Sequence, residues 1–204
     1  ALDDAGPGDE RQRMSGAGGD ETALSPVSTL VKRRLPWLYV NLATAFLAAS
    51  VVGFFEETIV KISALAVLLP IVAGQGGNAG AQTLAVVIRG LALREVVPGT
   101  GFRLILKELT GGLINGIAIA GVTAAGVYLW DRRWALATVI GAAMIVNLVA
   151  AGLAGAAITL LLRKLGRDPA QSSSIFMTTV TDVVGFASFL GFALLLTPHL
   201  TRAG

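Results

Sequence analysis

Long apolar stretches separated by short polar connections fill most of the sequence after its first 35 residues. Each stretch is long enough to cross a hydrocarbon core of about 30 Å as a helix, which takes roughly 20 residues. Their approximate bounds are 36–55, 59–93, 103–130, 135–162 and 171–197. The pattern therefore predicts an all-α membrane protein with five transmembrane helices.

The N-terminal region has the opposite pattern, because glycine and acidic residues are frequent and large apolar side chains are almost absent. Such a composition buries too little apolar surface to offset the entropy of folding. We therefore expect a disordered polar arm over 1–30, followed by a transmembrane domain over 31–200. Where the two meet, residues 25–35 are typical of a helix lying at the membrane surface, and Pro36 suits the first turn of the first span.

The second apolar stretch is too long for a simple span. As one straight helix, 59–93 would extend about 50 Å at roughly 1.5 Å per residue. Its middle segment, 70–82, contains a proline and four glycines, which are unfavourable inside a helix. The sequence thus predicts either a break in this helix or close packing of another helix against it.

Composition supports the membrane assignment and narrows the chemistry. Hydrophobic residues make up 54% of the chain and charged residues 14%, with a mean hydropathy of +0.72, outside the usual range of soluble domains. Cysteine is absent, which excludes disulfides, thiolate metal sites and cysteine nucleophiles. No basic stripe with interleaved aromatic residues occurs, so we expect membrane lipid and no nucleic acid among the partners.

The distribution of Lys and Arg predicts the orientation, since these residues concentrate on the cytoplasmic side of membrane helices. With the N-terminus inside and five spans, ten of the fourteen that follow the arm lie inside and four lie outside. Splitting the second stretch into two spans would remove this bias. We therefore expect a multi-pass protein of the cell membrane, with its N-terminus cytoplasmic and its C-terminus outside.

One acidic residue, Asp182, lies at membrane depth, about midway along the last apolar stretch. A charged carboxylate facing lipid would cost at least a few kcal/mol, so it should face water, a cation or another polar group. Helical spacing places Gln171, Ser174, Thr178 and Asp182 on one face, as a polar stripe. The stripe favours an ion pathway, and the alternative is a protonated or hydrogen-bonded aspartate that ties helices together.

A second candidate set lies in the glycine-rich segment of the second stretch, where Asn78 and Gln82 share a helical face with Gly74. Amide side chains can bind the water shell of an ion. The same small residues are equally typical of a helix-packing seam. The spacing alone leaves both interpretations open.

The available ligands favour a hard cation. Divalent cations of this kind prefer oxygen ligands, and Mg²⁺ keeps several of its waters because it dehydrates reluctantly. One aspartate is too few for a closed site, so we expect a homodimer in which two copies of Asp182 face a hydrated ion across the symmetry axis. No histidine cluster, carboxylate pair or activated nucleophile lies at membrane depth, so we expect no enzyme activity.

Several separated motifs, in order, resemble the membrane domain of the MgtE-type magnesium channels. They are Pro36-Trp37-Leu38, the run from Asn41 to Gly53, the run from Pro70 to Gln82, Arg89-Gly90, Lys107-Glu108-Leu109 and the run from Thr178 to Gly185. The resemblance covers about residues 36–197. It implies five helices per subunit, a homodimer with the pore on its axis, and selectivity for Mg²⁺ as a hydrated ion.

The resemblance also implies a metal site and a function. The pore aspartate of the family falls on Asp182, its neighbours on Thr178 and Ser174, and the polar segment of the second helix on Asn78 and Gln82. Mg²⁺ is then the transported and pore-bound ion, with no cofactor. We expect a channel for passive Mg²⁺ transport; the alternative is a secondary transporter of divalent cations coupled to protons or sodium, in which Asp182 would titrate.

The resemblance does not extend to the regulatory regions typical of the family, a cytoplasmic N-terminal domain and paired CBS domains that sense magnesium. The 35 residues before the first span are too few to form them. The chain is then either a membrane domain alone or a natural short form. We expect weak or no inhibition by internal Mg²⁺, and a separate regulatory protein is a candidate partner.

Overall fold

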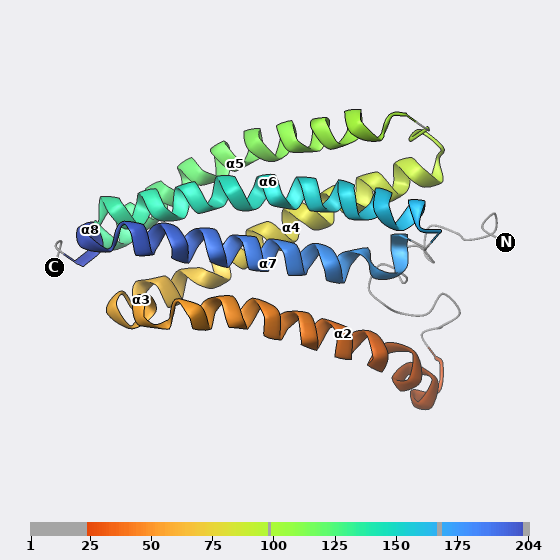
Figure 1. Ribbon diagram of the computed structural model, residues 1–204, viewed down its shortest axis with the longest axis horizontal. Coiled ribbons are helices and arrows are strands. Elements are labelled where there is room, and N and C mark those ends of the chain that lie inside the picture. The colour runs from red at the N-terminus through yellow and green to blue at the C-terminus, as the bar shows by residue number, and fades with distance from the viewer. Residues whose placement is uncertain (1–23, 98, 167–168, 202–204) are drawn as a thin grey trace.

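The computed structural model describes residues 24–97, 99–166 and 169–201, and every regular element within them is a helix (Figure 1). The helices are α2 (Val27–Phe54), α3 (Glu56–Lys61), α4 (Ala64–Ala92), α5 (Gly101–Asp131), α6 (Trp134–Lys164), α7 (Pro169–Leu195) and α8 (Thr197–Thr201). Among the described residues, five helices are long and apolar enough to cross a membrane, namely α2, α4, α5, α6 and most of α7. The prediction of an all-α protein with five transmembrane helices is confirmed.

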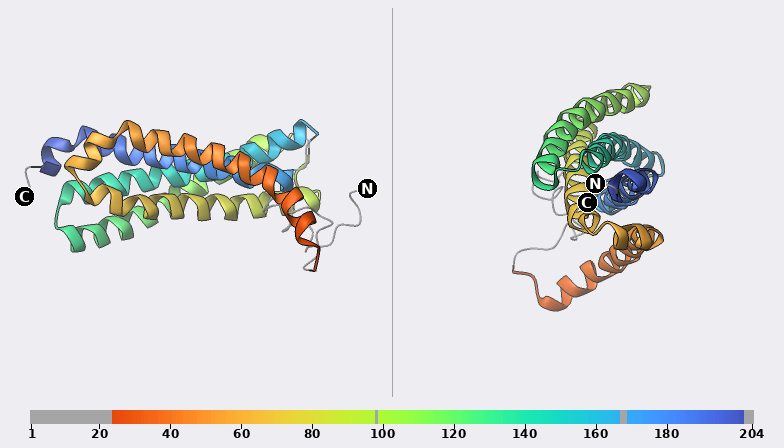
Figure 2. Two further views of the ribbon diagram at one scale, coloured as in Figure 1. Left: turned by 90° about the horizontal axis from the view of Figure 1, so that it is seen from below. Right: turned by 90° about the vertical axis from the view of Figure 1, so that its left-hand side faces the viewer.

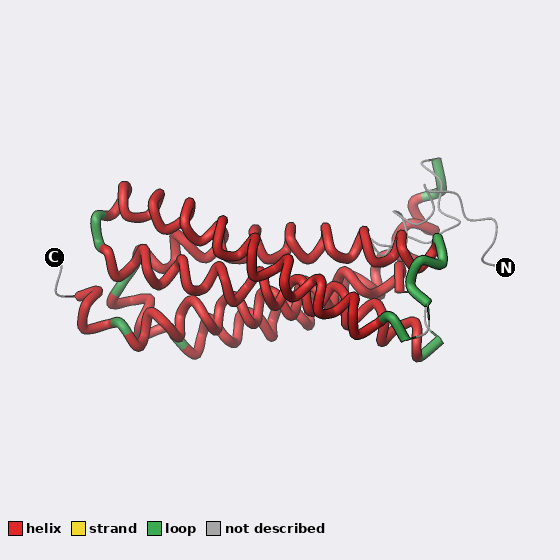
Figure 3. Tube along the Cα trace, turned by 90° about the horizontal axis from the view of Figure 1, so that it is seen from above, coloured by secondary structure: helices red, strands yellow, loops and turns green. Residues whose placement is uncertain are grey.

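The five long helices run side by side and alternate in direction, so that the connections lie at the two ends of the bundle (Figures 1 and 3). Helix α6 is the most buried of them and contacts α4, α5 and α7. Helices α4 and α7 also contact each other, whereas α2 packs mainly against α7 and stands apart from the rest (Figure 2). The core is therefore built around α6, with α4 and α7 on it as a pair.

The first span begins earlier than the sequence predicts. Helix α2 starts at Val27 and continues through Pro36, which lies inside it and not in its first turn. Residues 27–35 are thus the first part of the spanning helix, and its N-terminal end diverges from the bundle (Figure 2). A proline inside a helix removes one hydrogen bond and kinks or breaks the helix; here the helix continues past it. Residues 1–23, most of the predicted arm, lie outside the described residues.

The predicted break within the second stretch is wrong, and the alternative, close helix packing, is confirmed. Helix α4 is continuous from Ala64 to Ala92, and the interruption falls at residues 62–63, between α3 and α4. Two glycines of the 70–82 segment lie against other helices. A Cβ atom on Gly76 would lie 2.4 Å from Nδ2 of Asn147 on α6, and one on Gly80 would meet the side chain of Met177 on α7.

Glycines also set the distance between α5 and α6. A Cβ atom on Gly112 would lie 2.7 Å from the carbonyl oxygen of Leu148, and one on Gly152 would lie 2.6 Å from the carbonyl oxygen of Glu108. Both contacts are to backbone, which cannot rotate away as a side chain can. The two helices therefore approach closely enough that only glycine fits at these positions, as is common in membrane helix interfaces.

Replacing Gly112 with alanine should destabilise the bundle, because α5 must move away from α6 to admit the methyl group. Overpacking of this kind costs about 1–3 kcal/mol of unfolding free energy. The matched control is the neighbouring Gly111→Ala, since a Cβ atom there meets nothing within 4 Å. Thermal unfolding in detergent should show a lower midpoint for Gly112→Ala only; equal midpoints for the two variants would contradict the packing.

The charged residues separate between the two ends of the bundle. Nine of the described Lys and Arg residues lie at the end where α2 begins, which we call the basic end, and three lie at the opposite end. At the opposite end, Nη2 of Arg133 donates to Oδ2 of Asp131 at 2.8 Å, and Nη1 donates to the carbonyl oxygen of Leu200 at 3.3 Å. The nearby carboxylate of Asp131 raises the pKa of Arg133. This arginine therefore holds the α5–α6 turn to α8.

Candidate functional site

Asp182 lies near the middle of α7 and is half-buried. Within the described part of the chain, its carboxylate makes no hydrogen bond and no ion pair. The neighbouring hydroxyls are occupied by their own helix: Thr179 donates to the carbonyl oxygen of Ile175 at 2.6 Å and Thr181 to that of Thr178 at 2.9 Å. The alternative of an aspartate that ties helices together through a hydrogen bond finds no partner among these residues.

Thr178 and Ser174 lie on the same stripe of α7 as Asp182, one turn and two turns nearer the basic end, respectively. The Thr178 hydroxyl lies 3.0 Å from the carbonyl oxygens of Ser174 and Ile175, to which it can donate. Its oxygen remains able to accept a hydrogen bond from the space in front of it. The side chain of Gln171, the remaining stripe position, lies outside the described residues.

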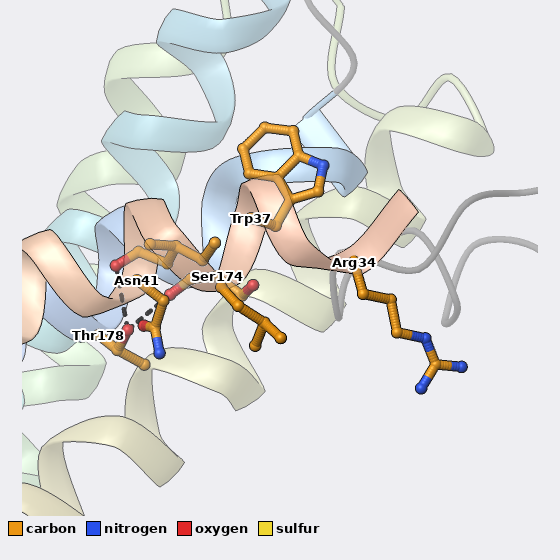
Figure 4. Close-up of a pocket in the computed structure, with 7 residues that line it drawn as sticks. Arg34, Trp37, Asn41, Ser174 and Thr178 are labelled. Atoms are coloured by element: carbon orange, nitrogen blue, oxygen red, sulfur yellow. Dashed lines mark hydrogen bonds between the residues drawn. The ribbon is translucent and has the colours of Figure 1, made fainter. Parts of the chain in front are cut away.

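A pocket of about 440 Å³ opens in front of these two residues, between α7 and α2 (Figure 4). Helix α2 contributes Asn41 and Trp37, and Figure 4 shows the Asn41 amide beside Thr178 and Ser174, whereas Arg34 extends away from them. Leu38 and Ile175 complete the lining. The part of the candidate site nearer the basic end is therefore lined by two helices, each with polar groups.

Asn41 is a residue that the sequence did not assign to the site. Its spacing within the first span gives no link to α7, which follows more than 100 residues later. The available signal is an amide within an otherwise apolar stretch, and interhelical hydrogen bonding explains such a residue equally well. Only the packing of α2 on α7 places Asn41 in the pocket with Ser174 and Thr178.

The two candidate residues on α4 do not join this pocket. Asn78 is exposed on the face of α4 opposite Gly76 and Gly80, which pack on α6 and α7. Gln82 is also exposed and lines a separate pocket of about 280 Å³ on the α5 side of α4. Within one chain, Ser174, Thr178 and Asp182 therefore lie on one stripe of α7, whereas Asn78 and Gln82 face away from it.

Asn78 and Asp182 nevertheless lie at the same depth. Gly76 of α4 and Gly185 of α7 both contact the side chain of Asn147, and Gly80 of α4 contacts Met177 of α7. Because the two helices run in opposite directions, these contacts bracket Asn78 on one helix and Asp182 on the other. The exposed amide and the carboxylate thus occupy one level of the bundle, on different faces.

The pocket that contains Gln82 is built around Glu108. Oγ1 of Thr83 donates to Oε2 of Glu108 at 3.1 Å, and Nζ of Lys107 lies 3.4 Å from Oε1. The Glu108 side chain is 15% exposed and that of Lys107 is 68% exposed. Lys107 and Glu108 therefore form an ion pair, and Glu108 also ties α5 to α4.

The donor set suits a hydrated ion better than a dehydrated one. Among the described residues, no three His, Cys, Asp or Glu side chains converge on one point. The oxygen atoms of one carboxylate, a threonine hydroxyl and amides can accept hydrogen bonds from water bound to a cation, and Mg²⁺ usually keeps several of its waters. The arrangement fits an ion that keeps most of its waters.

A bundle of five membrane-crossing helices with a lone carboxylate at mid-depth is typical of proteins that move ions across membranes. The family model described as "MgtE: Divalent cation transporter" matches residues 69–192, and the chain belongs to this family. The resemblance seen in the sequence is therefore confirmed. The family description is that of a transporter, in agreement with the expectation that the chain is not an enzyme.

Three curated relatives, each a magnesium transporter MgtE, are similar to the chain. That of Enterococcus faecalis is 36% identical over 88% of this chain and 40% of its own length. The Bacillus subtilis protein is 31% identical over 91% of this chain and 41% of its own length. The Thermus thermophilus protein is 35% identical over 80% of this chain and 36% of its own length. The chain spans about two fifths of the length of these relatives.

Proposed function

We propose that this chain is the transmembrane pore domain, residues 31–200, of a Mg²⁺-selective channel that carries magnesium passively across the cell membrane. The observation that carries the proposal is Asp182, a half-buried carboxylate at mid-depth with no partner among the described residues, in a member of a divalent cation transporter family. Isolated charge at this depth is costly unless water or a cation faces it. A hydrated Mg²⁺ ion supplies both.

The pocket between α2 and α7 supports a pathway for a hydrated ion. Six waters occupy about 180 Å³ at roughly 30 Å³ per molecule in the liquid, which is well below the 440 Å³ of this pocket. Asn41, Ser174 and Thr178 offer polar atoms that can hydrogen-bond to the water shell. We assign this pocket as the inner vestibule, from which an ion reaches Asp182 about one helical turn further on.

A homodimer completes the site in this proposal. Helix α4 exposes Gly74, Asn78 and Gln82 on one face, and a small, polar face is unfavourable against lipid but suited to another protein surface or to water. A second copy placed against this face supplies a second Asp182 at the depth of Asn78. Two carboxylates and the amides of both chains then surround one hydrated ion, and Asp182, Thr178, Ser174, Asn78 and Gln82 form its metal site.

The basic end lies in the cytoplasm in this proposal. Nine of the twelve described Lys and Arg residues lie at that end, and such a bias is characteristic of the cytoplasmic side. The N-terminus is then cytoplasmic and the C-terminus lies outside. The vestibule opens to the cytoplasm, and the Asp131–Arg133 turn faces outward.

A coupled transporter is the second candidate, and the same carboxylate favours it, because an acid without a partner can bind and release a proton during a cycle. Mg²⁺ flux into liposomes that contain the purified chain, at fixed membrane potential, separates the two. A channel should pass Mg²⁺ at a rate that follows the electrochemical gradient, with no requirement for a pH or sodium gradient. Flux that stops when those gradients are removed would establish coupling, and no Mg²⁺ flux under any gradient would contradict both.

A further inference from the structure

Asn147 occupies the centre of the interface among α4, α6 and α7. It belongs to α6, its side chain is fully buried, and Nδ2 donates to the carbonyl oxygen of Val72 on α4 at 2.8 Å. A buried amide that bonds across helices is held firmly, because breaking the bond leaves polar atoms without water. The bond joins α6 to α4 one turn before Gly76.

Two glycines on different helices make room for this amide. A Cβ atom on Gly76 of α4 would lie 2.4 Å from Nδ2 of Asn147, and one on Gly185 of α7 would lie 2.7 Å from the same atom. Neither helix can carry a side chain here without displacing the amide. Asn147 is therefore the spacer that sets how closely α4 and α7 approach α6, and hence each other.

The position of this spacer relates it to the proposed pore. Gly76 lies two residues from Asn78, and Gly185 lies one turn from Asp182. A shift of either helix at Asn147 therefore moves the pore-facing groups at the same depth. Asn147 itself lies behind α4 and α7, away from the pathway, so it does not contact the ion.

The oxygen of the amide adds a further constraint. Oδ1 of Asn147 is buried and has no hydrogen-bond partner, and it is the sole side-chain atom of that kind among the described residues. An apolar residue of similar size would avoid that penalty. For a polar residue to be favoured at this position, the free energy gained from the Nδ2 bond to Val72 must exceed the cost of leaving Oδ1 unpaired.

We infer that Asn147 is a positioning residue for the pore, which fixes the spacing and register of α4 against α7 so that Asn78 and Asp182 present their polar groups at one depth. The inference rests on the proposed function for its consequence in transport. Its geometric part, the coupling of Asn147 to the α4–α7 contact, is measurable without any flux.

Disulfide formation between introduced cysteines measures the contact directly, because this chain contains no cysteine. The pair Gly80→Cys and Met177→Cys places one thiol on each helix where the two touch. Asn147→Ala should change the rate of cross-linking at least fivefold. The matched control is Thr159→Ala, which removes another fully buried polar group of α6 whose hydroxyl bonds to Gly155 of its own helix, and should leave the rate unchanged.

Mg²⁺ flux into liposomes, measured on the chain without introduced cysteines, then shows the consequence for the pore. Asn147→Ala should raise the Mg²⁺ concentration for half-maximal flux at least fivefold, and Thr159→Ala should not. Gly76→Ala should impair flux strongly alone and much less in the Asn147→Ala background, because the methyl group then occupies the space left by the amide. Such non-additivity identifies a shared contact.

The outcomes distinguish the role proposed for Asn147 from the function proposed for the chain. A cross-linking rate that Asn147→Ala leaves unchanged would overturn the inference even in a chain that transports Mg²⁺. So would a loss of thermal stability with an unchanged half-maximal concentration, since Asn147 would then be a packing residue only. A wild-type chain that passes no Mg²⁺ would overturn the proposed function, and with it the pore role of Asn147.

Discussion

Replacing Asp182 with asparagine or alanine should reduce Mg²⁺ flux at least tenfold, because the variant chains offer no negative charge to a cation at mid-depth. The carboxylate has no partner among the described residues, so its removal leaves no charge unpaired inside the protein. The variants should therefore fold as well as the wild type. Flux into liposomes at fixed potential, together with the thermal unfolding midpoint in detergent, measures both quantities.

Two further variants sharpen this prediction. Asp182→Glu keeps the charge and moves it by one methylene, so it should retain more flux than Asp182→Asn while altering the preference among divalent cations. Glu57→Gln removes an acid that is 93% exposed on α3 and pairs weakly with Lys61 at 3.8 Å, so it should behave as the wild type. If all the Asp182 variants transported as the wild type does, the ion site would lie elsewhere.

A single cysteine at Asn78 should form a disulfide-linked dimer under oxidising conditions and block Mg²⁺ flux until a reductant is added. Asn78 is exposed on α4, and in the proposed homodimer the two copies of this face meet near the axis. A bridge between them would hold the pore helices of both subunits together across the pathway. Gel mobility without reductant reports the bridge, and flux before and after reduction reports the block.

The matched control is Val122→Cys, at a position on α5 that is 74% exposed. This cysteine should stay monomeric at the same protein-to-lipid ratio, because α5 lies on the side of α6 away from α7. Cross-linking of Val122→Cys without cross-linking of Asn78→Cys would place the subunit interface on α5 and refute the proposed axis.

The fold class followed from the sequence because membrane spans are set by length and apolarity alone. Five stretches of more than about 20 apolar residues permit few other structures in lipid, where backbone groups must be satisfied within helices. The limits of the helices were harder to predict. Pro36 is compatible with a helix start or with a helix interior, and only the structure shows that α2 continues through it from Val27.

Helix α4 shows why the glycine-rich segment could be interpreted in two ways. Glycine weakens a helix and also lets a neighbour approach, and both effects follow from the missing side chain. The outcome depends on what lies opposite, here Asn147 and Met177, which come from stretches 70 and more residues away. No local pattern carries that information.

The candidate site was predictable where it lies on one helix and not where it joins several. Helical period alone places Ser174 and Thr178 on the stripe of Asp182. The contribution of Asn41 depends on α2 packing against α7, and the orientation of Gln82 depends on the position of α5. The roles of all these residues in binding Mg²⁺ remain predictions for the experiments above.

The attachment of α2 to α7 has a consequence for how the chain is made. Helix α2 is synthesised before the other described helices, yet its main neighbour in the finished bundle is the last of the five spans, which starts more than 110 residues later. At about 5–20 residues per second, α2 waits roughly 6–23 s before that neighbour is synthesised. During this time it must remain inserted on its own hydrophobicity, so substitutions that make α2 more polar should reduce the yield of assembled protein before they affect its stability once folded.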